Sequence, residues 1–377
     1  MNTTGILLTA GIALGAIGAF PTTGSAEDAM DGRRTEMLQK MLKSPYPPDG
    51  FWHYEDLAIA AYYLGKNAQG DEAILQEADL FAKTKEKELS HFHWHAYILE
   101  RIYFLFGSKS KHFPGRMSPA AEKALVDMLW QWASPSLSLE MTLPERDRWI
   151  WGSENHHLQA WVSAWGAAQV FAGRADFKDK QFPDGTDMAT MAKAFDGYFS
   201  RWALNRASRG LFVECNSGYN KYSIGPLSNI ADFTQDPVLK RRMKMFLDVF
   251  WADWAIEQID AVRGGSRHRC YPGRESLEGG HMQGESWFLF GIGKPLSTHP
   301  SAMCVATSFY RPPQIVTDLV LNTPARGVYA YISRRPGRGQ ELIGSAARSF
   351  VANSGGEFNV KGLVYWLDPN CGDLVRY

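Results

Sequence analysis

Two stretches of the chain hold side chains whose chemistry suits proton transfer at an acidic ligand. In the first, residues 149–171 (WIWGSENHHLQAWVSAWGAAQVF), an asparagine and two histidines adjoin one another at Asn155, His156 and His157. The second, residues 211–227 (LFVECNSGYNKYSIGPL), carries a carboxylate, an amide and two tyrosines. Amide and imidazole N–H groups donate to carboxylates, and a tyrosine can take up and return a proton. The two stretches predict one cleft that receives an anion.

Both stretches are expected to lie where a helix begins. Ser153 precedes an apolar pattern with near-helical spacing, so it is predicted to cap a helix that starts at the Asn–His segment. Backbone N–H groups at such a start point outward and favour anions. Gly225-Pro226 is expected to start the second helix, with the tyrosines just before it. Neighbours on a helix point about 100° apart, so only one of His156 and His157 can face the cleft.

A uronic-acid polymer is a substrate that these groups would suit. β-Elimination needs a group that neutralises the C6 carboxylate, a base for the C5 proton and an acid for the C4 oxygen. Asn155 and a histidine or arginine can neutralise the carboxylate, and Tyr219, its pKa lowered by a nearby cation, can carry the proton both ways. One tyrosine suffices for mannuronate or glucuronate, whose C5 hydrogen and C4 oxygen share a ring face. Guluronate or galacturonate would need a second group opposite, for which His156 is the candidate.

The segments SENHHLQAW and LFVECNSGYNKYSIGPL resemble the Asn-His and Tyr-x-x-Tyr motifs of toroidal polysaccharide lyases, which include alginate lyases, glucuronan lyases and heparinase-type enzymes. The alginate and glucuronan lyases of polysaccharide lyase family thirty-eight are the nearest relatives that the motifs suggest. The resemblance covers roughly eighty residues. It implies an (α/α) toroid around a cleft, with Asn155 and His156 as the neutralising pair. It also implies that Tyr219 is the acid and base, with Tyr222 as the alternative.

The remaining members of the site are less sharply defined. Some relatives carry a catalytic arginine shortly before the tyrosine, where this chain has only Arg206 and Arg209. The identity of the catalytic arginine therefore stays open, with Arg267, which we include in the predicted catalytic set, and Arg269 as rivals. Glu214 is expected to orient Tyr219 or an arginine. The full predicted substrate-binding set is Glu214, Asn216, Lys221, Arg269, His157, Trp151 and His93. Trp149 and Trp151 are candidates for a sugar platform, whereas Trp161 and Trp165 on the helix face are expected in the core.

Several other chemistries find less support. The run His91, His93, His95 leads into a helix, on which residues two apart diverge, so we expect neither a metal ion nor a cofactor. The chain contains no GxSxG, HExxH or phosphate-loop pattern. Two alternatives stay open. A glycoside hydrolase would use Glu154 and Glu214 as paired carboxylates, and a glycan-binding protein would bind a polymer without cleaving it.

Composition limits the partners and suggests a location. The 377 residues are 45% hydrophobic with a formal net charge of zero and no long basic run, so nucleic acid is not an expected partner. The apolar run Ile6 to Phe20, followed by Gly24-Ser25-Ala26, predicts a signal peptide over residues 1–26. We therefore expect a periplasmic or secreted protein without a membrane anchor. The four widely spaced cysteines define neither a zinc site nor a disulfide framework.

Helical patterns dominate as far as residue 260. The predicted helices are Asp31–Leu42, Trp52–Leu64, His93–Phe106, Ser118–Trp132, His156–Phe171, Met188–Asn205, a short one after Pro226, and Pro237–Asp260. Their rhythm favours a mainly α fold, a complete or incomplete (α/α) toroid over residues 27–300, with a helical solenoid as the alternative. Residues 301–377 are expected to be strand-rich, with strands at Gly327–Ser333 and Gly362–Leu367. The chain ends within strand-like sequence, which is typical of a truncated protein.

Overall fold

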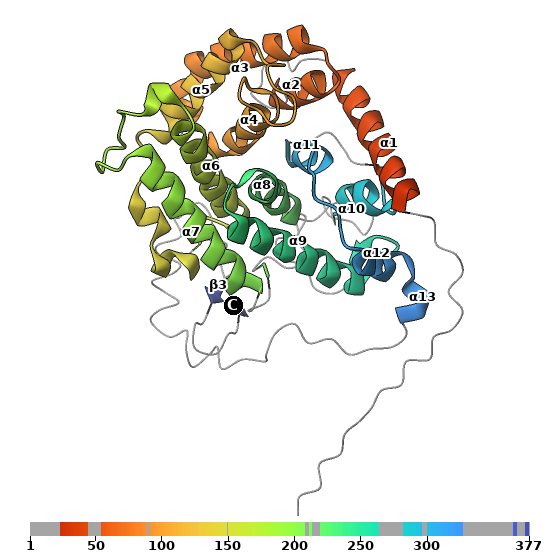
Figure 1. The fold of residues 1–377 in the computed structure, drawn as a ribbon. Helices are drawn as coiled ribbons and strands as arrows, with labels where there is room; N and C mark the ends of the chain where they lie inside the picture. Colours follow the sequence, from red (N-terminus) through yellow and green to blue (C-terminus); the bar gives the residue numbers. More distant parts are fainter. Residues whose placement is uncertain are drawn as a thin grey trace, which may run out of the picture.

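The computed structural model describes residues 23–43, 54–88, 91–148, 150–207, 211–212, 219–263, 282–295, 300–326, 365–367 and 374–376. This part of the chain is mainly helical, as predicted (Figure 1). The α-helices are α1 (Thr23–Leu42), α2 (Tyr54–Tyr63), α3 (Asn67–Glu88), α4 (His93–Phe106), α5 (Pro119–Ala133), α6 (Glu154–Ala172), α7 (Met188–Ala207), α8 (Asn220–Phe233), α9 (Pro237–Glu257), α10 (Gln283–Phe290), α11 (Pro300–Ala306), α12 (Gln314–Leu321) and α13 (Thr323–Arg326). Short 3-10 helices span Leu139–Thr142 (η1), Pro144–Arg148 (η2) and Ala175–Phe177 (η3).

Local signals set many of the helix ends. The Ser118 hydroxyl accepts a hydrogen bond from the N–H of Ala121 at 3.3 Å, and Pro119 is the first residue of α5. Asp236 likewise accepts hydrogen bonds from two N–H groups of the first turn of α9, at 2.7 and 3.0 Å. Gly65 follows α2 with φ +75°, a conformation that favours glycine. The hydrogen bonds to Ser118 and Asp236 satisfy N–H groups that have no partner inside the helix.

The helices pack in two sets. The pairs α2–α4, α4–α6, α6–α8, α8–α11 and α11–α2 are all in contact, so these five helices form a closed cycle. The other long helices lie against them: α1 and α3 on α2, α7 on α6, and α9 on α8, with α5 on α3 and α12 on α9. Figure 1 shows α4, α6, α8 and α11 toward the middle of the molecule, with α3, α5, α7, α9 and α12 around them.

A buried arginine ties the inner helices together. The guanidinium of Arg101 on α4 pairs with Asp232 at 2.8 Å and donates to Asn229 Oδ1 at 2.9 Å, both on α8. Its Nε donates to Thr307 Oγ1, just after α11, at 2.7 Å. Arg101 and the Asp232 side chain are shielded from water, so every hydrogen bond of the group comes from the protein. Trp165, predicted for the core, is fully buried and Trp161 nearly so.

Helix α8 begins earlier than the sequence predicts. Gly225-Pro226 lies inside the helix, which starts at Asn220. Proline has no N–H, so the carbonyl of Tyr222, four residues before Pro226, loses its helical partner. Gln159 of α6 donates its side-chain N–H to that carbonyl at 3.4 Å. A tertiary contact thus compensates for the proline, and the two tyrosines lie at the start of the helix instead of upstream of it.

The helical part also continues past the predicted boundary at residue 300, through α11, α12 and α13 to Arg326. Two small antiparallel pairs of strands are described, β1 (Gln258–Ile259) with β2 (Val262–Arg263), and β3 (Tyr365–Leu367) with β4 (Leu374–Arg376). The predicted strand Gly327–Ser333 lies outside the described residues, as do residues 1–22 and three of the four cysteines. Cys304 is buried and unpaired. Within the described ranges, no helix has both the length and the apolar character needed to cross a membrane.

Candidate functional site

Asn155 is the second residue of α6, so it lies where backbone N–H groups are exposed at the start of a helix. Ser153 occupies the predicted cap position, but its side chain caps no backbone group. Its hydroxyl donates instead to Asn155 Oδ1 at 2.7 Å. The hydrogen bond to Oδ1 orients the Asn155 amide, whose NH₂ group is its donor.

His156 turns toward the start of α4. Its Nδ1 accepts a hydrogen bond from the indole N–H of Trp94 at 3.3 Å and lies 3.3 Å from His93 Nε2. An indole nitrogen can only donate, so Nδ1 is the unprotonated nitrogen, and the neutral ring carries its proton on Nε2. The side chain of His156 is largely buried, with 8% exposed. In this tautomer the Nε2–H group is the hydrogen-bond donor of the His156 ring.

His157 turns the other way, as the helical spacing predicts. Its Nε2 lies 2.9 Å from the hydroxyl of Tyr198 on α7, and its Nδ1 accepts the backbone N–H of Trp151 at 3.3 Å. The ring stacks on Trp161 with centroids 4.1 Å apart. Burial, and secondarily the charge of Arg206, lower the pKa of His157 well below 6.5, so it is neutral at pH 7. This residue, predicted to bind substrate, is thus buried and holds Trp151 in place.

Arg206, one of the two arginines before the tyrosine motif, forms a buried ion pair. Its Nη1 lies 3.2 Å from Oε1 of Glu154, the first residue of α6, and both side chains are only 2% exposed. The pair links the last turn of α7 to the first turn of α6. Glu154 is one of the two carboxylates, with Glu214, that the hydrolase alternative would use, and in the structure it is paired with Arg206.

The tyrosines lie at the start of the neighbouring helix. Tyr219 directly precedes α8 and Tyr222 is in its first turn; both are half-buried, and their ring centroids are 5.9 Å apart. The ammonium of Lys221 lies 5.1 Å from the centre of the Tyr222 ring. Lys221 thus places a positive charge beside the ring of Tyr222. The hydrogen bond from Gln159 to Tyr222 brings the early turns of α6 and α8 side by side.

Aromatic rings border this region. Trp151 is 37% exposed, and its ring meets that of His93 edge to face at 5.5 Å. Trp94 is half-buried and packs against both His156 and His91. Sequence reasoning did not select Trp94 or Gln159, although Trp94 lies within the histidine run. Glu214, Asn216, Arg267 and Arg269, together with Trp149 and Arg209, lie outside the described residues.

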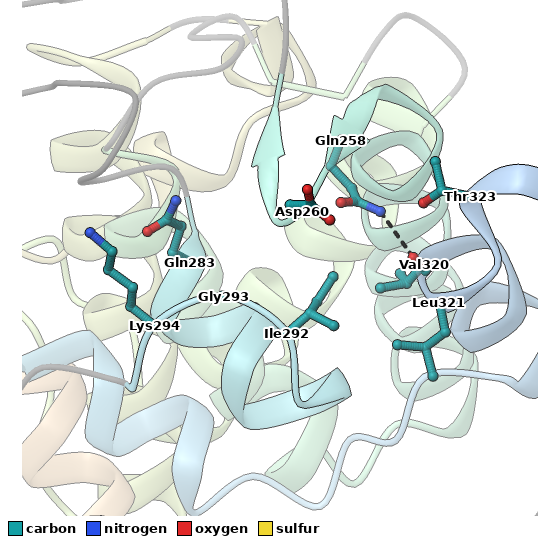
Figure 2. A pocket seen from close by; sticks show the side chains of 9 residues that line it. All are labelled: Gln258, Asp260, Gln283, Ile292, Gly293, Lys294, Val320, Leu321 and Thr323. Atoms are coloured by element: carbon teal, nitrogen blue, oxygen red, sulfur yellow. Dashed lines mark hydrogen bonds between the residues drawn. The ribbon is translucent and has the colours of Figure 1, made fainter.

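A cavity of about 440 Å³ lies elsewhere, between the end of α9, α10 and α12 (Figure 2). Figure 2 shows Lys294 and Gln283 on one side and Gln258 on the other, where the Gln258 amide donates to the Val320 carbonyl at 3.0 Å. None of the predicted site residues lines it. The described lining mixes amide and aliphatic side chains with one carboxylate, Asp260, one ammonium, Lys294, and one hydroxyl, Thr323.

No family model, curated protein or solved structure matches this chain. The function is therefore argued from the geometry of the site.

Proposed function

We propose that this protein is a polysaccharide lyase that cleaves a uronic-acid polymer, mannuronate-rich alginate or glucuronan, by β-elimination. One observation carries the proposal. The donors Asn155 and His156 lie about one helical turn before Gln159 on α6, and the Gln159 side chain donates to the backbone carbonyl of Tyr222 in the first turn of α8. Donors for a carboxylate beside a tyrosine are the groups that elimination from a uronate requires.

We infer further that the helices form an (α/α) toroid. The closed cycle of α2, α4, α6, α8 and α11, with the remaining long helices packed against it, supports this architecture. His93, His156 and Tyr222 all lie in the first turn of a helix of this cycle. A cleft at this end of the cycle would expose several helix starts to the substrate, and their partial positive charge would favour a polyanion.

In the proposed reaction the protein first neutralises the C6 carboxylate. The NH₂ group of Asn155 and the Nε2–H of His156 donate to the carboxylate oxygens, which makes the C5 proton acidic. The deprotonated hydroxyl of Tyr219 takes that proton. The electron pair forms the C4–C5 double bond as the bond from C4 to the leaving oxygen breaks, and the same proton passes from Tyr219 to that oxygen. Tyr222 remains the alternative, and Arg267 remains the predicted arginine.

The rings around the site would bind the sugar units. Trp151 presents an exposed indole beside His93, and half-buried Trp94 borders His156. Aromatic faces pack against the apolar faces of sugar rings, so these two residues would hold the polymer over the donors. No observation favours the hydrolase, because the ion pair with Arg206 occupies Glu154. A glycan-binding protein would not need a proton-transfer tyrosine.

The test is a panel of defined polymers. Polymannuronate, polyguluronate, glucuronan and a neutral glucan are incubated with the protein, and ultraviolet absorbance follows the conjugated unsaturated uronate that only elimination creates. We expect turnover of polymannuronate or glucuronan and none of the neutral glucan, since donors built for a carboxylate would be left unpaired by a neutral sugar. Comparable turnover of the neutral glucan would contradict the proposal.

Export is proposed with the function, since acidic polysaccharides are extracellular polymers. Sequencing the N-terminus of secreted or periplasmic material should find a mature chain that begins near Glu27. Intact Met1 in that material would contradict the predicted signal peptide.

A further inference from the structure

A group of acidic side chains and one imidazole lies in the core, where α2, α3 and α4 meet. Glu55 on α2 and Glu77 on α3 are completely buried, and His95 on α4 is 2% exposed. One ligand atom from each of these three residues lies within 4.8 Å of the other two. His95 Nδ1 is 2.8 Å from Glu55 Oε1. Three helices thus direct one nitrogen and two carboxylates at the same small volume.

This cluster has far more acceptors than donors. Within the described residues, neither carboxylate oxygen of Glu77 accepts a hydrogen bond, and neither does Oε2 of Glu55. Asp56, next to Glu55, adds a third completely buried carboxylate. Buried carboxylates are normally paired with a cation, bound to a metal or hydrogen-bonded, because transfer of their charge out of water is costly. The His95–Glu55 contact meets only a small part of that need.

We propose that Glu55, Glu77 and His95 bind a divalent metal ion that fastens α2, α3 and α4 to one another. Imidazole nitrogen combined with carboxylate oxygen is a donor set for Zn²⁺ or Mn²⁺, whereas Ca²⁺ prefers oxygen alone. Burial leaves no path for a substrate, so the ion would be structural, not catalytic. This inference does not depend on the proposed lyase activity.

The site also gives the histidine run a different meaning. Sequence reasoning expected no metal because histidines two apart diverge on a helix, and they do: His93 faces His156 whereas His95 faces Glu55. The partners of His95 are acidic residues of two other helices, which no local spacing reveals. A metal at His95 would fix the first turn of α4, which also carries His93 and Trp94.

The test compares the untagged full chain with two variants of α3. Glu77→Gln removes one proposed ligand with little change in volume, and Glu72→Gln makes the same substitution at an exposed position of the same helix. Protein is purified in medium containing Zn²⁺ and Mn²⁺ without chelators, and its metal content is measured by mass spectrometry. We expect about one ion per chain in the wild type and in Glu72→Gln. In Glu77→Gln the affinity should fall at least about tenfold.

Thermal unfolding supplies the second readout. Zn²⁺ or Mn²⁺ added to chelator-treated protein should raise Tm by roughly 2–5 °C in the wild type and in Glu72→Gln, but not in Glu77→Gln. If Glu77→Gln does not fold, titration of the metal-free wild type with Co²⁺ decides, because ligation by His95 and the carboxylates should produce visible absorption bands. Absence of both bound metal and a metal-dependent Tm in the wild type would overturn the proposal. Equal metal content in the wild type and Glu77→Gln would overturn it as well.

Discussion

Removal of Arg206 should destabilise the start of α6 because it takes away the guanidinium that pairs with the buried carboxylate of Glu154. Loss of one member of a buried ion pair typically costs about 3–5 kcal/mol of the free energy of unfolding. Both side chains are 2% exposed, so water cannot replace the guanidinium. Glu154 is the first residue of α6, where the helix dipole stabilises a negative charge by up to about 2 kcal/mol. We therefore expect Arg206→Met to cost about 3 kcal/mol, the lower end of that range.

Urea denaturation at pH 7 measures this cost against a matched control. Arg146→Met breaks an ion pair with Glu140 whose side chains are 29% and 66% exposed, and should cost less than about 1 kcal/mol. Adding Glu154→Gln to Arg206→Met removes the carboxylate charge that Arg206 neutralised. This second substitution should recover part of the lost free energy of unfolding, which a double-mutant cycle quantifies. The reasoning is refuted if Arg206→Met costs no more than the control, or if the double variant is less stable than Arg206→Met alone.

The other predictions concern catalysis, pH and packing. Tyr219→Phe should lower turnover by a factor of about 100 to 10,000 with intact helical circular dichroism, whereas Tyr222→Phe should cost much less; the reverse order would transfer the acid–base role to Tyr222. Burial lowers the pKa of His157 below its unfolded value of 6.5, so stability should fall as the pH drops below 6.5. Urea titrations should show that His157→Gln flattens this slope, and an unchanged slope would contradict the assignment. A Cβ at Gly166 would overlap the buried carboxylate of Glu100, so Gly166→Ala should lower the free energy of unfolding by about 1–3 kcal/mol, and wild-type stability would contradict that packing.

Features set by neighbouring residues were predictable from the sequence. Helix α4 has the predicted bounds, and Ser118 and Asp236 cap their helices, because a cap needs only residues two or three positions away. The opposite orientations of His156 and His157 follow from helical periodicity alone. Local patterns therefore predicted that a helix begins at the histidine segment, although the Ser153 side chain does not cap it.

Features that depend on distant residues were not predictable. Proline is common in the first turn of a helix, but α8 begins six residues before Pro226, and Gln159 of α6 donates to the Tyr222 carbonyl that the proline leaves without a helical partner. The β-branched, apolar run in Gln314–Leu321 suits a strand as well as a helix, and packing on α9 decides for the helix. The cluster of Glu55, Glu77 and His95 forms where three helices meet, so no local sequence motif predicts it.

The masses of the products test the central claim most directly. Oligosaccharides released from polymannuronate or glucuronan should include chains that are lighter by one water than the saturated oligomer of the same length, because elimination breaks the bond to C4 without adding water. Tyr219→Phe should release almost none of them. Saturated oligomers alone would show hydrolysis, and binding of the polymer without any released product would show a glycan-binding protein; either result would contradict the proposed lyase mechanism.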